Sequence, residues 1–187
     1  MNPIDYEINK ELGECYLFMG EYEKAQDYYE KALACDPKRS EPHMGLAAIA
    51  LNAGQLDVAY AHYCKADDIA SSDKTLAGMG MMEMESGEYE LAFTHFMASL
   101  EANPLNMVSI NGIVQLGYFF KRLEVVVPFL EQAIIHDDTN NEAIRYTLAG
   151  CLTSLGREAE AKEHLEIILG ANPGNSEAQH LYAQFAA

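Results

Sequence analysis

Residues 13–37 of the chain read GECYLFMGEYEKAQDYYEKALACDP. Gly20 interrupts one apolar helical pattern, and a second pattern covers residues 22–35 before Pro37 closes the stretch. Glycine accepts turn conformations that other residues avoid, and proline cannot continue a helix. The stretch therefore predicts two helices, at about 3–19 and 22–35, which lie antiparallel because their connection is short.

The same two-helix pattern occurs five times, in units that span about 6–39, 40–72, 73–106, 107–141 and 142–175. Each unit has a large apolar residue followed by a small one in its first helix, a turn residue, a small residue where the helices cross, and a large apolar residue four positions later. The large and small pairs are Leu12-Gly13, Leu46-Ala47, Met79-Gly80, Ile113-Val114 and Leu148-Ala149, and the turn residues are Gly20, Gly54, Gly87, Lys121 and Gly156. The residues at the crossing are Ala25, Ala59, Ala92, Val126 and Ala161. The large residues four positions later are Tyr29, Tyr63, Phe96, Leu130 and Leu165. Small residues let helix backbones approach closely, and large ones fill the groove beside them.

This period and these places resemble the tetratricopeptide repeat. The resemblance covers nearly the whole chain and implies an all-α, right-handed α-solenoid of five antiparallel helix-turn-helix repeats, with a capping helix at 176–187. We expect residues 1–187 to form a single solenoid domain. The sequence Ser176-Glu177-Ala178-Gln179 is typical of a capping box and predicts where the last helix starts.

Repeat four departs most from the common pattern. Lys121 replaces the turn glycine, Val114 and Val126 replace small residues, and Pro128 lies inside the second helix. Proline removes one backbone hydrogen bond and can bend a helix. We expect this repeat to be the least stable of the five.

Composition restricts the class of partner. The 187 residues include 12 basic and 29 acidic ones, a formal net charge of −17. Binding to nucleic acid or to anionic lipid is driven largely by Lys and Arg, so neither is an expected partner, whereas a basic protein would be attracted. The sequence has no secretory signal pattern and no apolar run long enough to insert into a membrane. Because the four cysteines show no disulfide or CxxC spacing, we expect a reduced, cytoplasmic protein.

Catalysis is not expected, because the chain has no phosphate-binding glycine-rich loop, no HExxH and no GxSxG motif. The alternative is an enzyme-accessory or metal-binding domain that uses His62, His95 and His164, which occupy one place in three second helices. Equivalent positions on packed helices lie roughly 8 to 10 Å apart, whereas zinc ligands lie about 2.1 Å from the metal. We therefore interpret the histidines as half-buried packing residues and expect no metal and no cofactor.

The resemblance places a ligand groove along the first helices of the repeats. The family commonly binds an extended or helical peptide there, which suggests a bacterial adaptor that acts as an assembly scaffold or a secretion-type chaperone. The candidate groove residues are Lys10, Glu14, Met44, Ala48, Lys74, Met81, Met84, Asn111, Gln115, Tyr118 and Tyr146. Side-chain amides can hydrogen-bond a peptide backbone, and tyrosines provide contact area at low entropy cost.

Two further expectations concern the N-terminal end of the array. Glu7, Glu14 and Glu41 favour a basic flank on the ligand. The first helix also carries an apolar stripe at helical spacing, and exposed apolar patches tend to mark interaction sites. The stripe consists of Ile4, Ile8, Leu12, Cys15 and Met19. It either supports a homodimer or is covered by the partner, and the alternative is a monomer in which Glu7 and Glu11 flank the stripe sufficiently.

Overall fold

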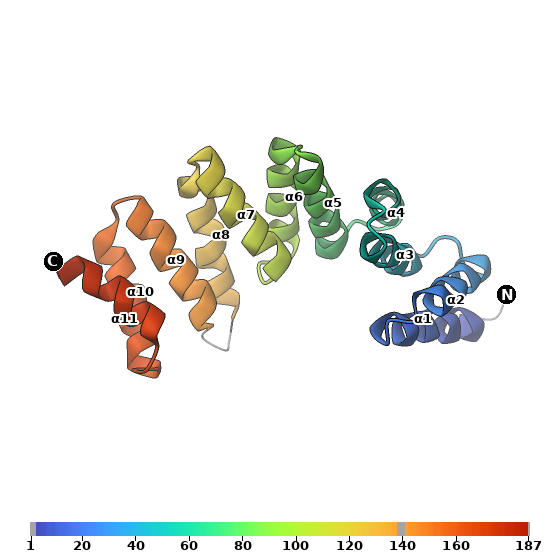
Figure 1. Cartoon of the computed structure of the whole chain (residues 1–187), viewed down its shortest axis with the longest axis horizontal. Helices are drawn as coiled ribbons and strands as arrows, with labels where there is room; N and C mark the ends of the chain where they lie inside the picture. Colours follow the sequence, from blue (N-terminus) through green and yellow to red (C-terminus); the bar gives the residue numbers. More distant parts are fainter. Residues whose placement is uncertain (1–2, 138–140, 187) are drawn as a thin grey trace. The chain divides into compact units, whose positions relative to one another are not determined.

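The computed structural model describes residues 3–137 and 141–186, and 83% of the described residues are helical. The helices are α1 (Pro3–Phe18), α2 (Tyr22–Cys35), α3 (Glu41–Asn52), α4 (Leu56–Ile69), α5 (Asp73–Ser86), α6 (Tyr89–Ala102), α7 (Met107–Phe120), α8 (Leu123–His136), α9 (Glu142–Ser154), α10 (Glu158–Ala171) and α11 (Ser176–Ala183), followed by a 3-10 turn at Gln184–Ala186. No strand occurs in this described part. The predicted all-α repeat fold, with five pairs of helices and an eleventh helix, is confirmed (Figure 1).

The chain divides into two compact units, Met1–Ala102 and Asn103–Ala187, which are described one at a time. The first unit contains the helix pairs α1–α2, α3–α4 and α5–α6, and the second contains α7–α8, α9–α10 and α11. Short connections turn each pair back on itself (Figure 1).

The core of the first unit is built on aromatic rings that lie against glycines. Tyr29 of α2 is 2% exposed, and its ring fills the space beside Gly13 of α1 and Gly45 of α3. A Cβ atom on Gly13 would lie 2.7 Å from the ring, and one on Gly45 would overlap it more severely. Burial is the main reason that the pKa of Tyr29 rises to about 12. One ring therefore joins three helices and two repeats.

The next two repeats use the same contact. The ring of Tyr63 in α4 lies against Gly78 of α5, and the ring of Phe96 in α6 lies against Gly80 of α5. Phe96 is buried at 1% exposure, and Tyr63 is half-buried. Because a glycine leaves room for each ring, the helices approach more closely than a larger residue would permit.

Substituting Gly45→Ala should lower the free energy of unfolding by about 1 to 3 kcal/mol, because the added methyl group overlaps the Tyr29 ring. Urea denaturation followed by circular dichroism measures this loss. The matched control is Gly170→Ala in α10, where nothing lies within 4 Å of the new atom. That substitution should leave stability unchanged or raise it by up to about 1 kcal/mol. Equal losses for the two variants would contradict the role given to the Tyr29 ring.

The second unit explains how repeat four tolerates its departures. Lys121 adopts φ of 56°, the left-handed conformation that Gly20, Gly54, Gly87 and Gly156 adopt at the same turn. The backbone N–H of Lys121 still caps α7 by donating to the carbonyls of Gly117 and Tyr118. The turn is therefore retained at a conformational cost that glycine does not incur.

Repeat four also differs from the other repeats in which helix carries the small residue at the helix crossing. Val126 of α8 stands where the other repeats have alanine, and it packs against Gly117 of α7. A Cβ atom on Gly117 would overlap the Val126 side chain. The small residue has moved from the second helix to the first, and α8 runs without a break through Pro128.

Replacing Lys121 by glycine should raise the free energy of unfolding by about 1 kcal/mol, because the left-handed conformation strains every residue with a Cβ atom. Lys121→Ala is the control, since it removes the same exposed side chain but keeps the strain. Thermal melts of the three proteins test the idea. A glycine variant no more stable than the alanine variant would contradict it.

Helix α11 begins at Ser176, as predicted, but its N-cap differs from the prediction. Asn175, and not Ser176, is the N-cap residue, and its side chain accepts a hydrogen bond from the backbone N–H of Ala178 at 3.0 Å. The predicted capping box is therefore wrong by one residue. The Nδ2 atoms of Asn175 and Asn172 also donate to Glu142 of α9, at 2.9 and 3.2 Å. These contacts fix α11 to the preceding repeat.

The apolar stripe of α1 is largely exposed. Ile4, Ile8 and Met19 are exposed to 61%, 50% and 59%, and Cys15 is exposed as well. Tyr6, on another side of the helix, is buried and donates to Glu41. Self-association through the stripe stays a prediction.

Candidate functional site

The predicted groove residues of the first unit come from α1, α3 and α5, and none of them is buried. On α3, Met44 and Ala48 lie opposite Leu46 and Ala50, which pack into the core. At 3.6 residues per turn, the two pairs are on opposite sides of the helix. Met81, at 36% exposure, and the half-buried Met84 are on α5.

The acidic end of the candidate groove is partly neutralised by contacts that sequence reasoning missed. Lys10 pairs with Glu7 at 3.0 Å, and this pairing raises the pKa of Lys10. Arg39 reaches Glu7 at 3.5 Å and Glu41 at 3.1 Å. Glu14 is exposed and has no ion pair within the described residues. Of the three acidic residues predicted to attract a basic ligand, two are therefore already paired.

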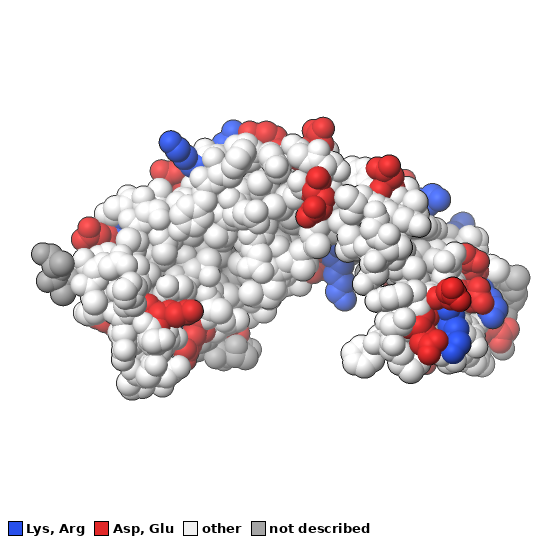
Figure 2. Space-filling model, viewed as in Figure 1, with Lys and Arg blue, Asp and Glu red and all other residues white. Residues whose placement is uncertain are grey.

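The second unit presents an uncharged surface. Helix α7 contains no charged residue, and its exposed side chains include Val108, Tyr118 and Phe119, at 44%, 45% and 63%. Asn111 and Gln115 are exposed on the same helix, and Tyr146 is half-buried on α9. In Figure 2 the area over α7 and α9 is mostly white, whereas red and blue atoms gather over α1 and α2.

Tyr118 links the two first helices of this unit. Its hydroxyl lies 3.3 Å from the Ser154 hydroxyl of α9. A Cβ atom on Gly150 would lie 3.8 Å from the same hydroxyl. The Tyr118 side chain therefore reaches α9 beside Gly150, which has no side chain. Burial is the main factor that raises the pKa of Tyr118. The tyrosine is thus held in place while part of its ring remains accessible.

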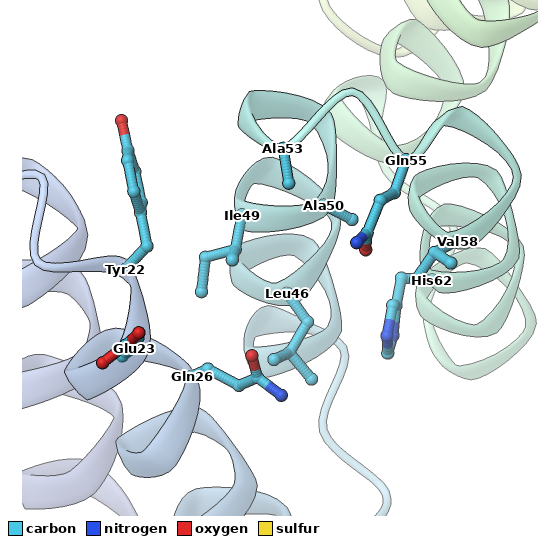
Figure 3. A pocket seen from close by; sticks show the side chains of 10 residues that line it. All are labelled: Tyr22, Glu23, Gln26, Leu46, Ile49, Ala50, Ala53, Gln55, Val58 and His62. Carbon is cyan, nitrogen blue, oxygen red and sulfur yellow. The ribbon is translucent and has the colours of Figure 1, made fainter.

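Sequence reasoning missed a crevice in the first unit, bounded by α2, α3 and α4 (Figure 3). Its volume is about 430 Å³. The floor is apolar and includes Leu46, Ile49 and Val58, and the rim includes Glu23 and Gln26 of α2. We name this space the first crevice.

A second crevice of about 150 Å³ lies at the equivalent place between α4, α5 and α6. It is smaller because polar side chains fill it. Glu83 is 3% exposed and accepts a hydrogen bond from the Tyr60 hydroxyl at 3.0 Å. The other carboxylate oxygen of Glu83 lies 2.7 Å from Nδ1 of His95. Burial, followed by the contact with Glu83, raises the pKa of Tyr60.

The three histidines at equivalent places, His62, His95 and His164, have different surroundings. His95 pairs with Glu83, whereas Nδ1 of His62 lies 3.2 Å from Nδ1 of His43. Burial lowers the pKa of both His43 and His62, and the nearby Lys65 lowers each further. His164 Nδ1 is buried, and it has no hydrogen-bond partner among the residues that the structure describes. Across the described ranges, no three His, Cys, Asp or Glu residues are grouped so that they could hold a metal ion.

Family comparisons agree with this geometry. Two models of the tetratricopeptide repeat match the chain, over residues 6–39 and 121–185. The chain belongs to the tetratricopeptide repeat superfamily. Proteins built from this repeat generally act as protein–protein interaction modules and not as enzymes. In the described ranges, no helix is long and apolar enough to cross a bilayer.

Two curated relatives are longer than this chain. It is 32% identical over 111 residues to the BBSome complex member BBS4 of Bos taurus, an alignment that covers 59% of this chain and 21% of that protein. It is 26% identical over 179 residues to the TPR repeat-containing protein YpiA of Bacillus subtilis (strain 168), with coverage of 92% and 41%. The chain thus spans less than half the length of either relative.

Solved structures show the same fold at low identity. Pseudomonas aeruginosa PilF superposes with a TM-score of 0.73 at 19% identity, covering 95% of this chain and 81% of that one. YrrB, described as a TPR protein with an unusual peptide-binding site, gives 0.65 at 15%, with coverage of 90% and 87%. MamA gives 0.65 at 14%, with coverage of 97% and 94%.

The polar cluster in the second crevice should contribute to folding. Tyr60→Phe should lower the free energy of unfolding by about 1.5 to 3 kcal/mol, because it removes a hydrogen bond to a buried carboxylate. In a Glu83→Ala background the same substitution should have little effect, as a double-mutant cycle would measure. Tyr22→Phe is the control, since its hydroxyl donates to Asn52 at the exposed surface. Additive effects of Tyr60→Phe and Glu83→Ala would show that the two side chains are not coupled.

Proposed function

We propose that this chain is a non-enzymatic module that binds an extended segment of a partner protein along the exposed faces of its first helices, as an assembly scaffold or a secretion-type chaperone. The observation that carries the proposal is the uncharged helix α7, on which Val108 is exposed near the start and Tyr118 and Phe119 are exposed near the end. Exposed apolar surface of this kind tends to mark interaction sites.

The polar side chains of this face suit a peptide backbone. Asn111 and Gln115 each offer one acceptor and two donor hydrogens, so they can pair with peptide groups whatever the ligand sequence. Tyr118 is already tied to Ser154, so a ligand that stacks on its ring restricts little additional motion. Tyr146 on α9 adds a second aromatic contact.

The first unit adds a softer apolar surface. Met81 and Met84 lie three positions apart on α5, which is a spacing that brings side chains together on one side of a helix. Methionine is flexible and polarisable, so it adapts to ligands of different shape. Within the acidic first unit, Glu14 is available to a basic ligand flank, whereas Glu7 and Glu41 are engaged by Arg39.

The relatives support a binding role without naming a partner. YrrB is described as carrying a peptide-binding site, and BBS4 is a member of the BBSome complex. Both descriptions fit a repeat array that joins other proteins, which is the role proposed for this chain.

Random-sequence peptides displayed on phage can be selected against the purified full chain to test the proposal. For a selected peptide, Tyr118→Ala should weaken binding by about 1 to 2 kcal/mol, because it removes contact area without removing buried core. Tyr146→Ala should weaken it by a smaller amount, and for a selected peptide that binds to the first unit Met81→Ala should do the same. Isothermal titration calorimetry gives the affinities, and thermal melts should show little loss of folding stability.

Ile135→Ala is the matched control, because Ile135 is a large apolar residue of α8 with 70% exposure that lies outside the proposed groove. Affinity should be unchanged by that substitution. Selected peptides that bind equally well to the wild type and to the Tyr118, Tyr146 and Met81 variants would refute the proposal.

A further inference from the structure

The two crevices of the first unit are the same space in successive repeats, with different side chains. Gln26 of the first crevice corresponds to Tyr60 of the second, and His62 corresponds to His95. The decisive difference is at the floor, where Ala50 stands in place of Glu83. The protein fills the second crevice with its own side chains and leaves the first one open.

The open crevice has the size of a ligand site. Pockets of about 300 to 1,000 Å³ hold ligands much larger than one side chain. At about 430 Å³, the first crevice can take a long side chain together with adjoining backbone. It lies on the side of α3 opposite Met44 and Ala48, so it is separate from the proposed groove.

The polar groups at the rim are mainly hydrogen-bond acceptors. Glu23 has no ion pair or hydrogen bond from its side chain within the described residues. Gln26 uses its amide nitrogen to donate to Glu30 at 2.8 Å, which leaves its amide oxygen to accept. Gln55 supplies a second amide oxygen from the start of α4. A ligand with several N–H donors would satisfy these groups.

The surroundings favour a cation. Residues 1–102 contain 19 of the 29 acidic residues and 7 of the 12 basic ones, so the unit attracts positive charge. Tyr22 lies at the mouth of the crevice, with its hydroxyl fixed to Asn52 at 3.1 Å (Figure 3). A guanidinium group can stack on such a ring. His62 adds no positive charge while it is neutral, as its lowered pKa favours.

We propose that the first crevice binds an arginine side chain of a partner protein. The aliphatic part of that side chain covers Leu46, Ile49 and Val58, and its guanidinium group donates to Glu23 and to the oxygens of Gln26 and Gln55. Arginine fits better than lysine because its planar group presents five N–H donors to several acceptors at once.

The competing ligand is a carboxylate that would occupy, in the first crevice, the place that the Glu83 carboxylate occupies in the second. In the second crevice Glu83 accepts a hydrogen bond from the Tyr60 hydroxyl, whereas the amide nitrogen of the equivalent Gln26 donates to Glu30. A bound carboxylate would also lie near Glu23. Lys65, near His62 on α4, is the cation that would favour it, and the experiment therefore includes an acidic probe.

The test uses the full chain labelled with nitrogen-15 and three capped peptides of five residues, each with alanine around one central residue. The central residues are arginine, its uncharged isostere citrulline, and glutamate. The arginine peptide should shift the amide signals of Gln26, Ile49 and Val58 in a saturable way. The citrulline and glutamate peptides should bind at least about tenfold more weakly, since a hydrogen bond to a charged group contributes about this factor.

Two variants locate the site. Glu23→Gln should weaken binding of the arginine peptide about tenfold. Gln26→Tyr should abolish it, because tyrosine fills the second crevice at that position. Ile135→Ala, in the other unit and outside the proposed groove, is the control and should leave the affinity unchanged.

Three results would overturn the inference. One is a citrulline or glutamate peptide that binds as well as the arginine peptide. Another is a set of shifts that lies outside the crevice. The third is arginine binding that survives both Glu23→Gln and Gln26→Tyr, provided that circular dichroism shows both variants to be folded.

Discussion

The contact of an aromatic ring with a glycine on a neighbouring helix sets the spacing of the first unit. Tyr29 touches Gly13 within its own repeat and Gly45 in the next one, so the same ring closes a hairpin and joins it to its neighbour. Tyr63 against Gly78 repeats the second of these contacts. Since interiors are close-packed, neither side of the contact can change size alone. Repeat four obeys the same rule with a valine in place of the ring, as Val126 of α8 lies against Gly117 of α7.

Much of the fold could be predicted from the sequence because the same two-helix pattern occurs five times, so each helix assignment is supported by the others. The range predicted for the second helix, residues 22–35, agrees with α2, and the first was predicted only one residue too long. The roles of single residues were harder to predict from the sequence. Asn175 and Ser176 are both good N-cap residues, and only the hydrogen bond to Ala178 identifies the first as the cap. Lys121 could be recognised as a departure, but its left-handed backbone required the structure.

The candidate site was less accessible to sequence reasoning. A groove position depends on which side of one helix a residue occupies, so helical spacing and the family resemblance were sufficient to nominate residues such as Met81 and Tyr118. The first crevice depends on three helices and on side chains that are absent from it. Its signal was the substitution of Ala50 for Glu83 and of Gln26 for Tyr60, which becomes visible when the repeats are compared place by place. The ion pair of Arg39 with Glu7 joins residues 32 positions apart, which is too far to be read from a local sequence pattern.

The difference between Ala50 and Glu83 has a consequence for how such arrays change over time. The residues at two places of the repeat, Gln26 and Ala50 in the first crevice and Tyr60 and Glu83 in the second, distinguish a space that is open from one that the protein fills. Each junction between repeats can therefore gain or lose a pocket independently of the others. An array of similar units can in this way acquire a distinct set of contacts along its length through side-chain substitutions.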